Sequence, residues 1–156
     1  MPYTVRQIAD FFITLANDEK FDDNIPEWIT HLKLQKILYF AQSAFLAMDR
    51  WAVFNEKIEA WKYWPVIPEI YQVFKWNTGL LSLADRNFDN FSIITTEDQS
   101  LLKDIWEEFG KYSAKKLVDI THDHAPWKNV YMEWVPNIEI TQDSLRTYYS
   151  GMFSIA

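Results

Sequence analysis

The densest group of potential metal ligands in the sequence is His122-Asp123-His124, and the chain has one further histidine, His31. Histidine ligands on one helix stand four residues apart, whereas His122 and His124 point to different faces of a helix. His31 would complete a three-histidine set only if folding brought it close. We therefore expect no metal site. We place His122 at a helix end, where an imidazole meets free carbonyl groups and the negative end of the helix dipole.

Hydrolytic chemistry would need an activated serine, or two carboxylates with separated pKa values. Ser113 is better placed to cap a helix. Glu56, Glu59 and Glu69 are spread through a turn-containing segment, where carboxylates are usually solvated. The sequence contains no G-x-S-x-G motif, P-loop or dinucleotide fingerprint, and it has no cysteine for thiol catalysis. We predict no catalytic residue and no cofactor.

The segment around Tyr63-Trp64-Pro65 is a candidate protein-binding surface, with Trp61 and Tyr71 close by. Aromatic side chains lose little conformational entropy on binding and often anchor interfaces. The chain is rich in them, with 8 Trp, 8 Tyr and 11 Phe. An alternative is that these rings close the core over an irregular segment. We name Trp61, Tyr63, Trp64 and Pro65 as candidate partner-binding residues.

Length, charge and composition restrict the class of protein. A chain of 156 residues fits one domain, which we assign to residues 1–156. A net charge of −7 repels nucleic acid and favours a basic protein partner. No stretch has 18 uninterrupted apolar residues, and the N-terminus does not resemble a signal peptide, so we expect no membrane partner. The absence of cysteine suits a reducing cytoplasm, and the oligomeric state stays open.

Residues 30–49 predict the helix around which the chain folds. Thr30 is a suitable N-cap. Written as a heptad from Leu34, the segment places polar side chains at only two of the seven positions. A helix that is apolar around most of its circumference must be covered by other elements. We therefore expect a buried central helix.

The remaining helices follow from capping signals and apolar periodicity. T-x-x-Q capping boxes begin at Thr4 and Thr96, Pro68 and Ser113 mark two further starts, and Thr141 or Asp143 begins the last helix. Short extended structure is expected near residues 56–60. The predicted helices are 4–16, 68–75, 96–110, 113–122, a turn from 126 and a C-terminal helix. The fold class is therefore all-α, a single compact domain of about six helices around the central helix, with at most a short β element.

Three segments, in this order, resemble the Panacea-domain antitoxin family: THLKLQKILYFAQSAFLA, EKIEAWKYWPVIPEIYQVF and SAKKLVDITHDHAPW. That family, which includes phage-associated GepA-like proteins and SocA-like proteolytic adaptors, has Leu-Gln-Lys-Leu-Leu-Tyr-Tyr, Ala-Trp-x-Tyr-Gly-Pro-Val and Thr-His-x-x-x-Pro-Trp patterns. The matching positions are Leu34, Gln35, Lys36, Ile37, Leu38, Tyr39, Phe40, Ala60, Trp61, Tyr63, Pro65, Val66, Tyr71, Thr121, His122, Pro126 and Trp127. Trp64 stands where the family pattern has glycine, a residue that permits positive φ and close backbone approach.

The resemblance implies a cytoplasmic antitoxin of bacterial or prophage origin. Such a protein binds a cognate protein toxin stoichiometrically and blocks it, and some relatives deliver the toxin to a protease. Masking needs no catalytic residue. The alternative function is a helical enzyme of unknown chemistry.

Overall fold

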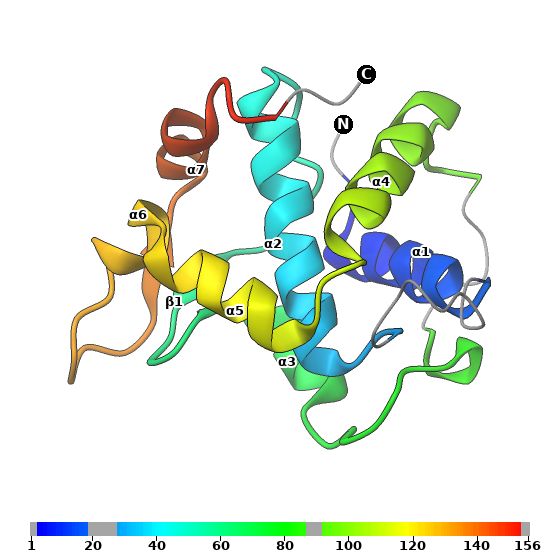
Figure 1. Cartoon of the computed structure of the whole chain (residues 1–156), viewed down its shortest axis with the longest axis horizontal. Helices are drawn as coiled ribbons and strands as arrows, with labels where there is room; N and C mark the ends of the chain where they lie inside the picture. Colours follow the sequence, from blue (N-terminus) through cyan, green and yellow to red (C-terminus); the bar gives the residue numbers. More distant parts are fainter. Residues whose placement is uncertain (1–2, 19–27, 87–91, 154–156) are drawn as a thin grey trace.

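The computed structural model describes residues 3–18, 28–86 and 92–153. This part of the chain is mainly helical, as predicted, with one small antiparallel sheet (Figure 1). The helices are α1 (Val5–Asp18), α2 (His31–Ala47), α3 (Pro68–Phe74), α4 (Thr96–Phe109), α5 (Ala114–Asp123), α6 (Ala125–Lys128) and α7 (Gln142–Tyr149), with a short 3-10 helix, η1 (Leu83–Asp85). None of the helices in these ranges is long and apolar enough to cross a membrane.

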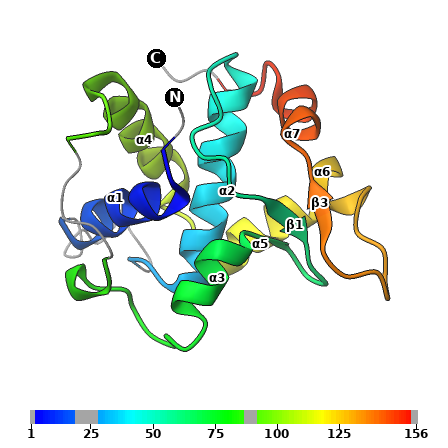
Figure 2. The same cartoon turned by 180° about the vertical axis from the view of Figure 1, so that it is seen from behind.

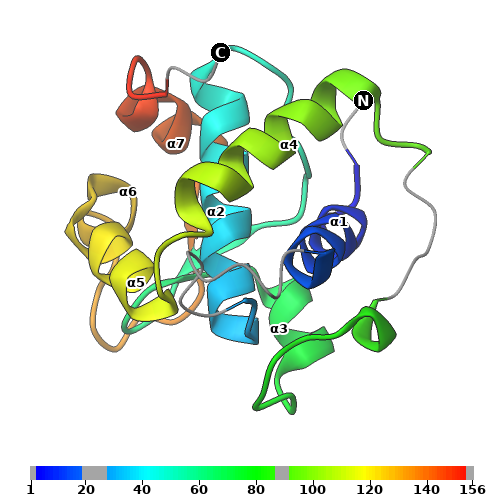
Figure 3. The ribbon, with the colours of Figure 1, turned by 45° about the vertical axis from the view of Figure 1, so that its right-hand side comes forward.

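Helix α2 is the buried centre of the fold, which confirms the central-helix prediction. Every residue from Lys33 to Leu46 is buried. Helices α1, α4, α5 and α7 pack around it (Figure 3). The Thr30 side chain accepts a hydrogen bond from the Lys33 backbone N–H at 3.2 Å, so the predicted N-cap is also confirmed.

The two predicted capping boxes have different outcomes. At α1 the box is present: the Thr4 N–H donates to Gln7 Oε1 at 2.9 Å, and the Gln7 N–H donates to the Thr4 hydroxyl at 3.2 Å. At α4 the prediction is wrong by one residue. The N-cap is Thr95, whose hydroxyl accepts from the Asp98 N–H, and Thr96 is already helical.

Tertiary contacts explain this shift at α4. The Thr95 N–H donates to the Tyr3 hydroxyl at 3.1 Å, which holds Thr95 in the extended conformation that an N-cap requires. The Gln99 side chain reaches past the cap and donates to the Ile94 carbonyl at 2.9 Å. Neither contact is visible in the spacing of the T-x-x-Q motif.

The other helix starts agree with the sequence, except that α6 begins at Ala125, one residue before the predicted Pro126. Pro68 opens α3, and the Ser113 and Thr141 hydroxyls cap α5 and α7. Helical spacing predicts that Tyr71 on α3 and Tyr148 on α7 point inward, and both predictions are wrong. Tyr71 is only half-buried, and Tyr149 rather than Tyr148 is the buried tyrosine of α7.

The sheet has strand order β2-β1-β3, with β1 (Ile58–Ala60), β2 (Pro65–Val66) and β3 (Ile138–Ile140) all antiparallel. Glu59 pairs with Val66 on one side and with Glu139 on the other. Strand β3 was not predicted, because three residues between Pro136 and Thr141 give no periodic signal. The sequence also predicts solvated loops at residues 17–24 and 85–90, and most of both segments lies outside the described residues.

Candidate functional site

The polar side chains of α2 bind the backbone of the segment that carries the second motif. Gln35 accepts from the Ile67 N–H at 2.8 Å and donates to the Ile67 carbonyl at 3.2 Å. Two turns further along the same face of α2, Gln42 accepts from the Val53 N–H at 2.9 Å and donates to the Phe54 carbonyl at 2.7 Å, just before that segment. Each glutamine thus satisfies buried backbone groups that the small sheet does not reach. The family-motif position Gln35 is therefore structural.

Lys36, the next motif position, is fully buried on α2. Its Nζ donates to the Pro65 carbonyl and lies 5.6 Å from the centre of the Trp64 ring. Burial lowers the pKa of Lys36 well below its ordinary value. Burial also lowers the pKa of His31 to about 4, and Lys36 acts in the same direction. Lys36 therefore fixes strand β2 and Trp64 against the core.

The third motif contacts the second through the indole of Trp127. The Trp127 Nε1–H donates to the Trp61 carbonyl at 2.8 Å. The His122 ring packs against the Trp127 ring, with 4.2 Å between ring centres. The Tyr131 ring also stacks on the Trp127 ring, at 5.1 Å between centres and an interplanar angle of 6°. Trp61 in turn meets Tyr71 edge to face at 4.9 Å. All three motifs therefore meet at one corner of the fold.

The four candidate partner-binding residues lie together at this corner, but they face different ways. They surround the turn from β1 to β2, where the Trp61 N–H donates to the Trp64 carbonyl at 3.1 Å. Tyr63 is 56% exposed, Trp61 and Trp64 are half-buried, and Pro65 is buried. Among the described non-glycine residues, positive φ occurs only at Asp49, Trp134 and Asn137, so Trp64 fits its position without a left-handed backbone.

The histidines are not brought together. His122 ends α5 beside Trp127, and His31 lies at the start of α2 near Gln35. His124 Nδ1 is 2.7 Å from the Tyr149 hydroxyl, which is 2.9 Å from the Tyr39 hydroxyl. Burial raises the pKa of Tyr149, so this phenol stays neutral and serves as a hydrogen-bonding link between α2 and α7. Over the described ranges, no three histidine or carboxylate side chains are grouped to hold a metal ion.

The candidate serine and glutamates also have structural contacts. Ser113 caps α5. Glu56 accepts from the Val5 N–H at 3.2 Å, Glu59 accepts from the Trp61 indole at 3.0 Å, and Glu69 pairs with Arg6 at 2.8 Å. They belong to different contacts, so they do not form a pair of catalytic carboxylates.

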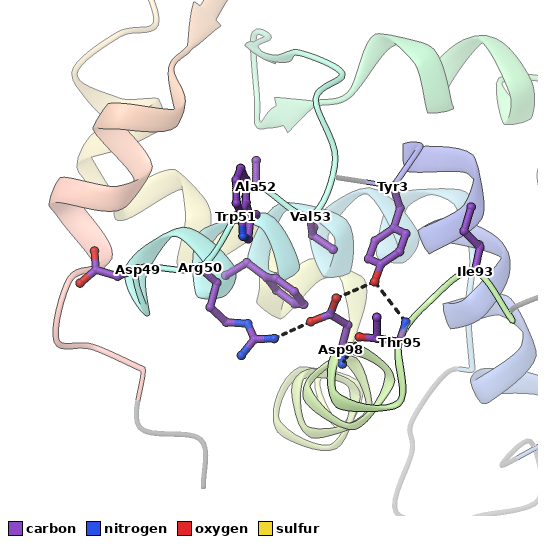
Figure 4. Close-up of a pocket in the computed structure, with 10 residues that line it drawn as sticks. Tyr3, Asp49, Arg50, Trp51, Ala52, Val53, Ile93, Thr95 and Asp98 are labelled. Atoms are coloured by element: carbon purple, nitrogen blue, oxygen red, sulfur yellow. Dashed lines mark hydrogen bonds and ion pairs between the residues drawn. The ribbon is translucent and has the colours of Figure 1, made fainter. Parts of the chain in front are cut away.

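A pocket of about 560 Å³ lies at the C-terminal end of α2 (Figure 4). Arg50 and the Tyr3 hydroxyl both point at Asp98, at 2.5 and 2.6 Å (Figure 4). Burial raises the pKa of Asp98, but hydrogen bonds from Tyr3 and Arg50 outweigh it, and the pKa lies below its ordinary value. These polar groups already bind one another, so they hold α4 against α2.

The loop between α6 and β3, residues 129–137, was not predicted as a candidate surface. Trp134 is 91% exposed there, and its φ is 71°, in the left-handed region. Asn137 follows at a φ of 61°. Residues 60–62, 131–132 and 134–137 line a groove of about 550 Å³. The available signal was Met132, Trp134 and Val135 in a segment with no helical or strand period, which predicts exposure rather than burial.

Comparison with known protein families identifies the family of the segment that carries the three motifs. The sequence model of the family described as "Antitoxin SocA-like, Panacea domain" matches residues 34–128, from the first turn of α2 through α6. The chain belongs to this family. The span contains all three motifs and the whole turn between β1 and β2.

One curated relative is the protein named Antitoxin SocA from Caulobacter vibrioides (strain NA1000 / CB15N). It is 33% identical to this chain over 110 residues, which cover 64% of the chain. The chain spans 58% of the length of that relative. No solved structure matches the chain. Membership of an antitoxin family therefore rests on the sequence motifs, and the structure shows where they meet.

Proposed function

We propose that this chain is an antitoxin that neutralises a cognate protein toxin by direct, stoichiometric binding, with residues 1–156 acting as one Panacea-type unit. Membership of the Panacea-domain family and the printed name of the Caulobacter relative support the antitoxin role. The internal contacts of Ser113, Glu59 and Glu69 support binding rather than catalysis.

One observation carries the proposal of direct binding. Tyr63 is exposed at the turn between β1 and β2, beside the half-buried Trp61 and Trp64, on a chain with a net charge of −7. Exposed aromatic rings supported by buried neighbours are typical interface anchors. The negative charge attracts a basic protein partner and repels nucleic acid. We propose Trp61, Tyr63 and Trp64 as the centre of the toxin-binding surface, with the buried Pro65 supporting the turn that carries them.

The test is rescue of bacterial growth. The product of the neighbouring gene is induced alone, and then together with the wild-type chain, Tyr63→Ala or Trp64→Ala. We expect Tyr63→Ala to lose rescue while melting like the wild type, because an exposed ring contributes little to folding. Trp64→Ala should lose rescue and also melt somewhat lower, because its ring covers Lys36. Trp76→Ala, which removes another exposed indole, is the matched control.

Stoichiometry separates this proposal from an enzymatic one. Rescue should appear only when the chain reaches equimolar amounts with the toxin. Full rescue at a small fraction of the toxin concentration would contradict masking. The toxin half-life, measured after protein synthesis is stopped, distinguishes masking from delivery to a protease, since only delivery shortens it. We propose that this activity takes place in the bacterial cytoplasm. Fractionation of cells that carry the tagged chain tests this location.

A further inference from the structure

The turn between β1 and β2 and the loop before β3 form the two walls of one groove. Figures 1 and 2 show both segments projecting in the same direction, away from α1 and α4. Ala60, Trp61 and Lys62 line one wall, and Tyr131, Met132 and residues 134–137 line the other. The groove is about 550 Å³, large enough for one or two side chains.

The base of this groove is firmly held. Trp127 donates to the Trp61 carbonyl from below one wall and stacks on Tyr131, which begins the other. Ala60 pairs with Ile138, so the walls also meet across the sheet. A preformed groove reduces the entropy cost of binding. The two walls therefore need not rearrange to receive a ligand.

Trp134 stands at the rim in a backbone conformation that bulky side chains rarely adopt. Its ring is 91% exposed, so the folded chain gains little apolar burial from it. Met132 and Val135 beside it are also exposed. An apolar rim of this kind marks an interaction surface. A ligand confined to the groove would leave the indole uncovered, which favours a macromolecular partner over a small molecule.

The charges near the groove favour a basic partner. Glu133 is exposed between the lining residues Met132 and Trp134, and Glu139 is exposed two residues after Asn137, while residues 131–140 contain no lysine or arginine. Neither glutamate lines the groove itself; both flank the lining residues along the chain. Lys62 is the cation in the lining, and its Nζ lies over the Tyr63 ring at 5.4 Å. A second copy would bring the same exposed glutamates and the same net charge of −7 to this face, so charge repulsion opposes pairing there. A second copy is therefore a poor occupant.

We infer that this groove receives an extended segment of the partner protein, with an apolar side chain between the walls and a flanking lysine or arginine facing Glu133 and Glu139. Trp134 covers that segment from the rim. The identity of the partner as a toxin rests on the proposed function. One wall lies inside the family span 34–128 and the other lies after it, so the loop containing Trp134 belongs to the part of this chain outside the matched domain.

The first test does not depend on a toxin. A phage-displayed library of random linear peptides is selected on the purified full chain, and in parallel on Trp134→Ala and on Trp76→Ala. Trp76 is 86% exposed, which makes it a matched control. We expect peptides with a large apolar residue beside lysine or arginine to be enriched on the wild type and on Trp76→Ala. Their affinity should fall about thirtyfold on Trp134→Ala, the loss of a hot-spot residue.

Charge-reversal variants test the requirement for a basic residue in the ligand. The double change Glu133→Lys and Glu139→Lys should weaken the selected peptides and reduce the salt dependence of binding, whereas Glu107→Lys on α4 should do neither. No enrichment, equal binding to Trp134→Ala, or peptides without basic residues would overturn the inference. A dimer in light scattering that Trp134→Ala dissociates would also overturn it, because a second copy would then fill the groove.

Binding experiments with the toxin distinguish a failure of this inference from a failure of the proposed function. If the chain neutralises a toxin, a selected peptide should compete with it, and Trp134→Ala should weaken toxin binding while Trp76→Ala does not. Toxin binding that the peptide and Trp134→Ala leave unchanged would overturn the inference while the proposed function stands. Selected peptides that bind a chain unable to rescue growth would contradict the function and leave the groove assigned to another basic partner.

Discussion

Gln35 holds both polar groups of the Ile67 peptide backbone, the N–H at 2.8 Å and the carbonyl at 3.2 Å. Ile67 is the N-cap residue of α3 and has no side-chain cap of its own. A side chain of the central helix therefore fixes the point at which α3 begins. The polar motif residues of α2 thus position the segment that carries the candidate binding residues.

Replacing Gln35 with Met should destabilise the fold by about 2–4 kcal/mol, because a buried N–H and a buried carbonyl both lose their partner. Urea unfolding followed by circular dichroism measures this change. Gln72→Met on the exposed face of α3 is the control and should change stability by less than about 0.5 kcal/mol. Equal stability of the two variants would show that water replaces Gln35.

Truncation of Leu38 or Phe45 to Ala should cost about 2–5 kcal/mol each, through lost apolar transfer energy and the cavity left behind. Both side chains are buried on α2. Thermal and urea unfolding of the single and double variants provide the measurement. A folded double variant with nearly unchanged melting would be incompatible with α2 as the centre of the core.

Gly110 should resist substitution for a steric reason. Its φ of −63° suits any residue, but an added Cβ would lie 2.5 Å from the Trp106 carbonyl oxygen and 2.8 Å from the Trp106 ring. We expect Gly110→Ala to destabilise the chain by about 1–3 kcal/mol. Gly79→Ala meets nothing within 4 Å and should be neutral or slightly stabilising. Comparison of the two melting temperatures decides this prediction.

Lys36 should make stability depend on pH. Burial lowers its pKa in the folded chain well below the value of 10.5 expected when unfolded. Between these two pKa values the unfolded chain binds more protons, so the free energy of unfolding rises with pH, by up to about 1.4 kcal/mol per pH unit. Lys36→Met should remove this contribution. Urea titrations of both proteins from neutral to alkaline pH test it, and identical slopes would contradict it.

Trp127→Ala should destabilise the chain by about 3–5 kcal/mol, because the indole is buried and its N–H holds the Trp61 carbonyl. Trp127→Phe should recover most of the packing and leave only the cost of the lost hydrogen bond, about 1–3 kcal/mol. Differential scanning calorimetry of both variants gives the two values. A Trp127→Ala protein that melts like the wild type would show that the contact between the second and third motifs does not contribute to stability.

Most helix positions were predictable because their signals are local. Caps such as Thr30, Ser113 and Thr141 contact backbone groups only two or three residues away, so the sequence displays cap and helix together. The failure at Thr95 has the opposite cause. Two threonines offered equivalent local caps, and the distant Tyr3 hydroxyl selects the first one.

The candidate surface was only partly predictable. The aromatic enrichment near residues 61–65 indicated a binding surface, but adjacent residues of one turn differ in exposure, with Tyr63 outside and Trp64 against Lys36. The opposing wall around Trp134 was not predicted at all. The left-handed backbone of this loop could not be predicted from a glycine, because the positive φ is at a tryptophan.

The sequence by itself determined the family, the helical class and the buried central helix, because motifs, caps and periodicity depend on neighbours along the chain. The tertiary structure alone decided which backbone groups Gln35 and Lys36 bind, 32 and 29 residues away. It also decided that residues 60–62, 131–132 and 134–137 line one groove. Long-range pairing depends on how several elements pack at once, and no local pattern encodes that arrangement.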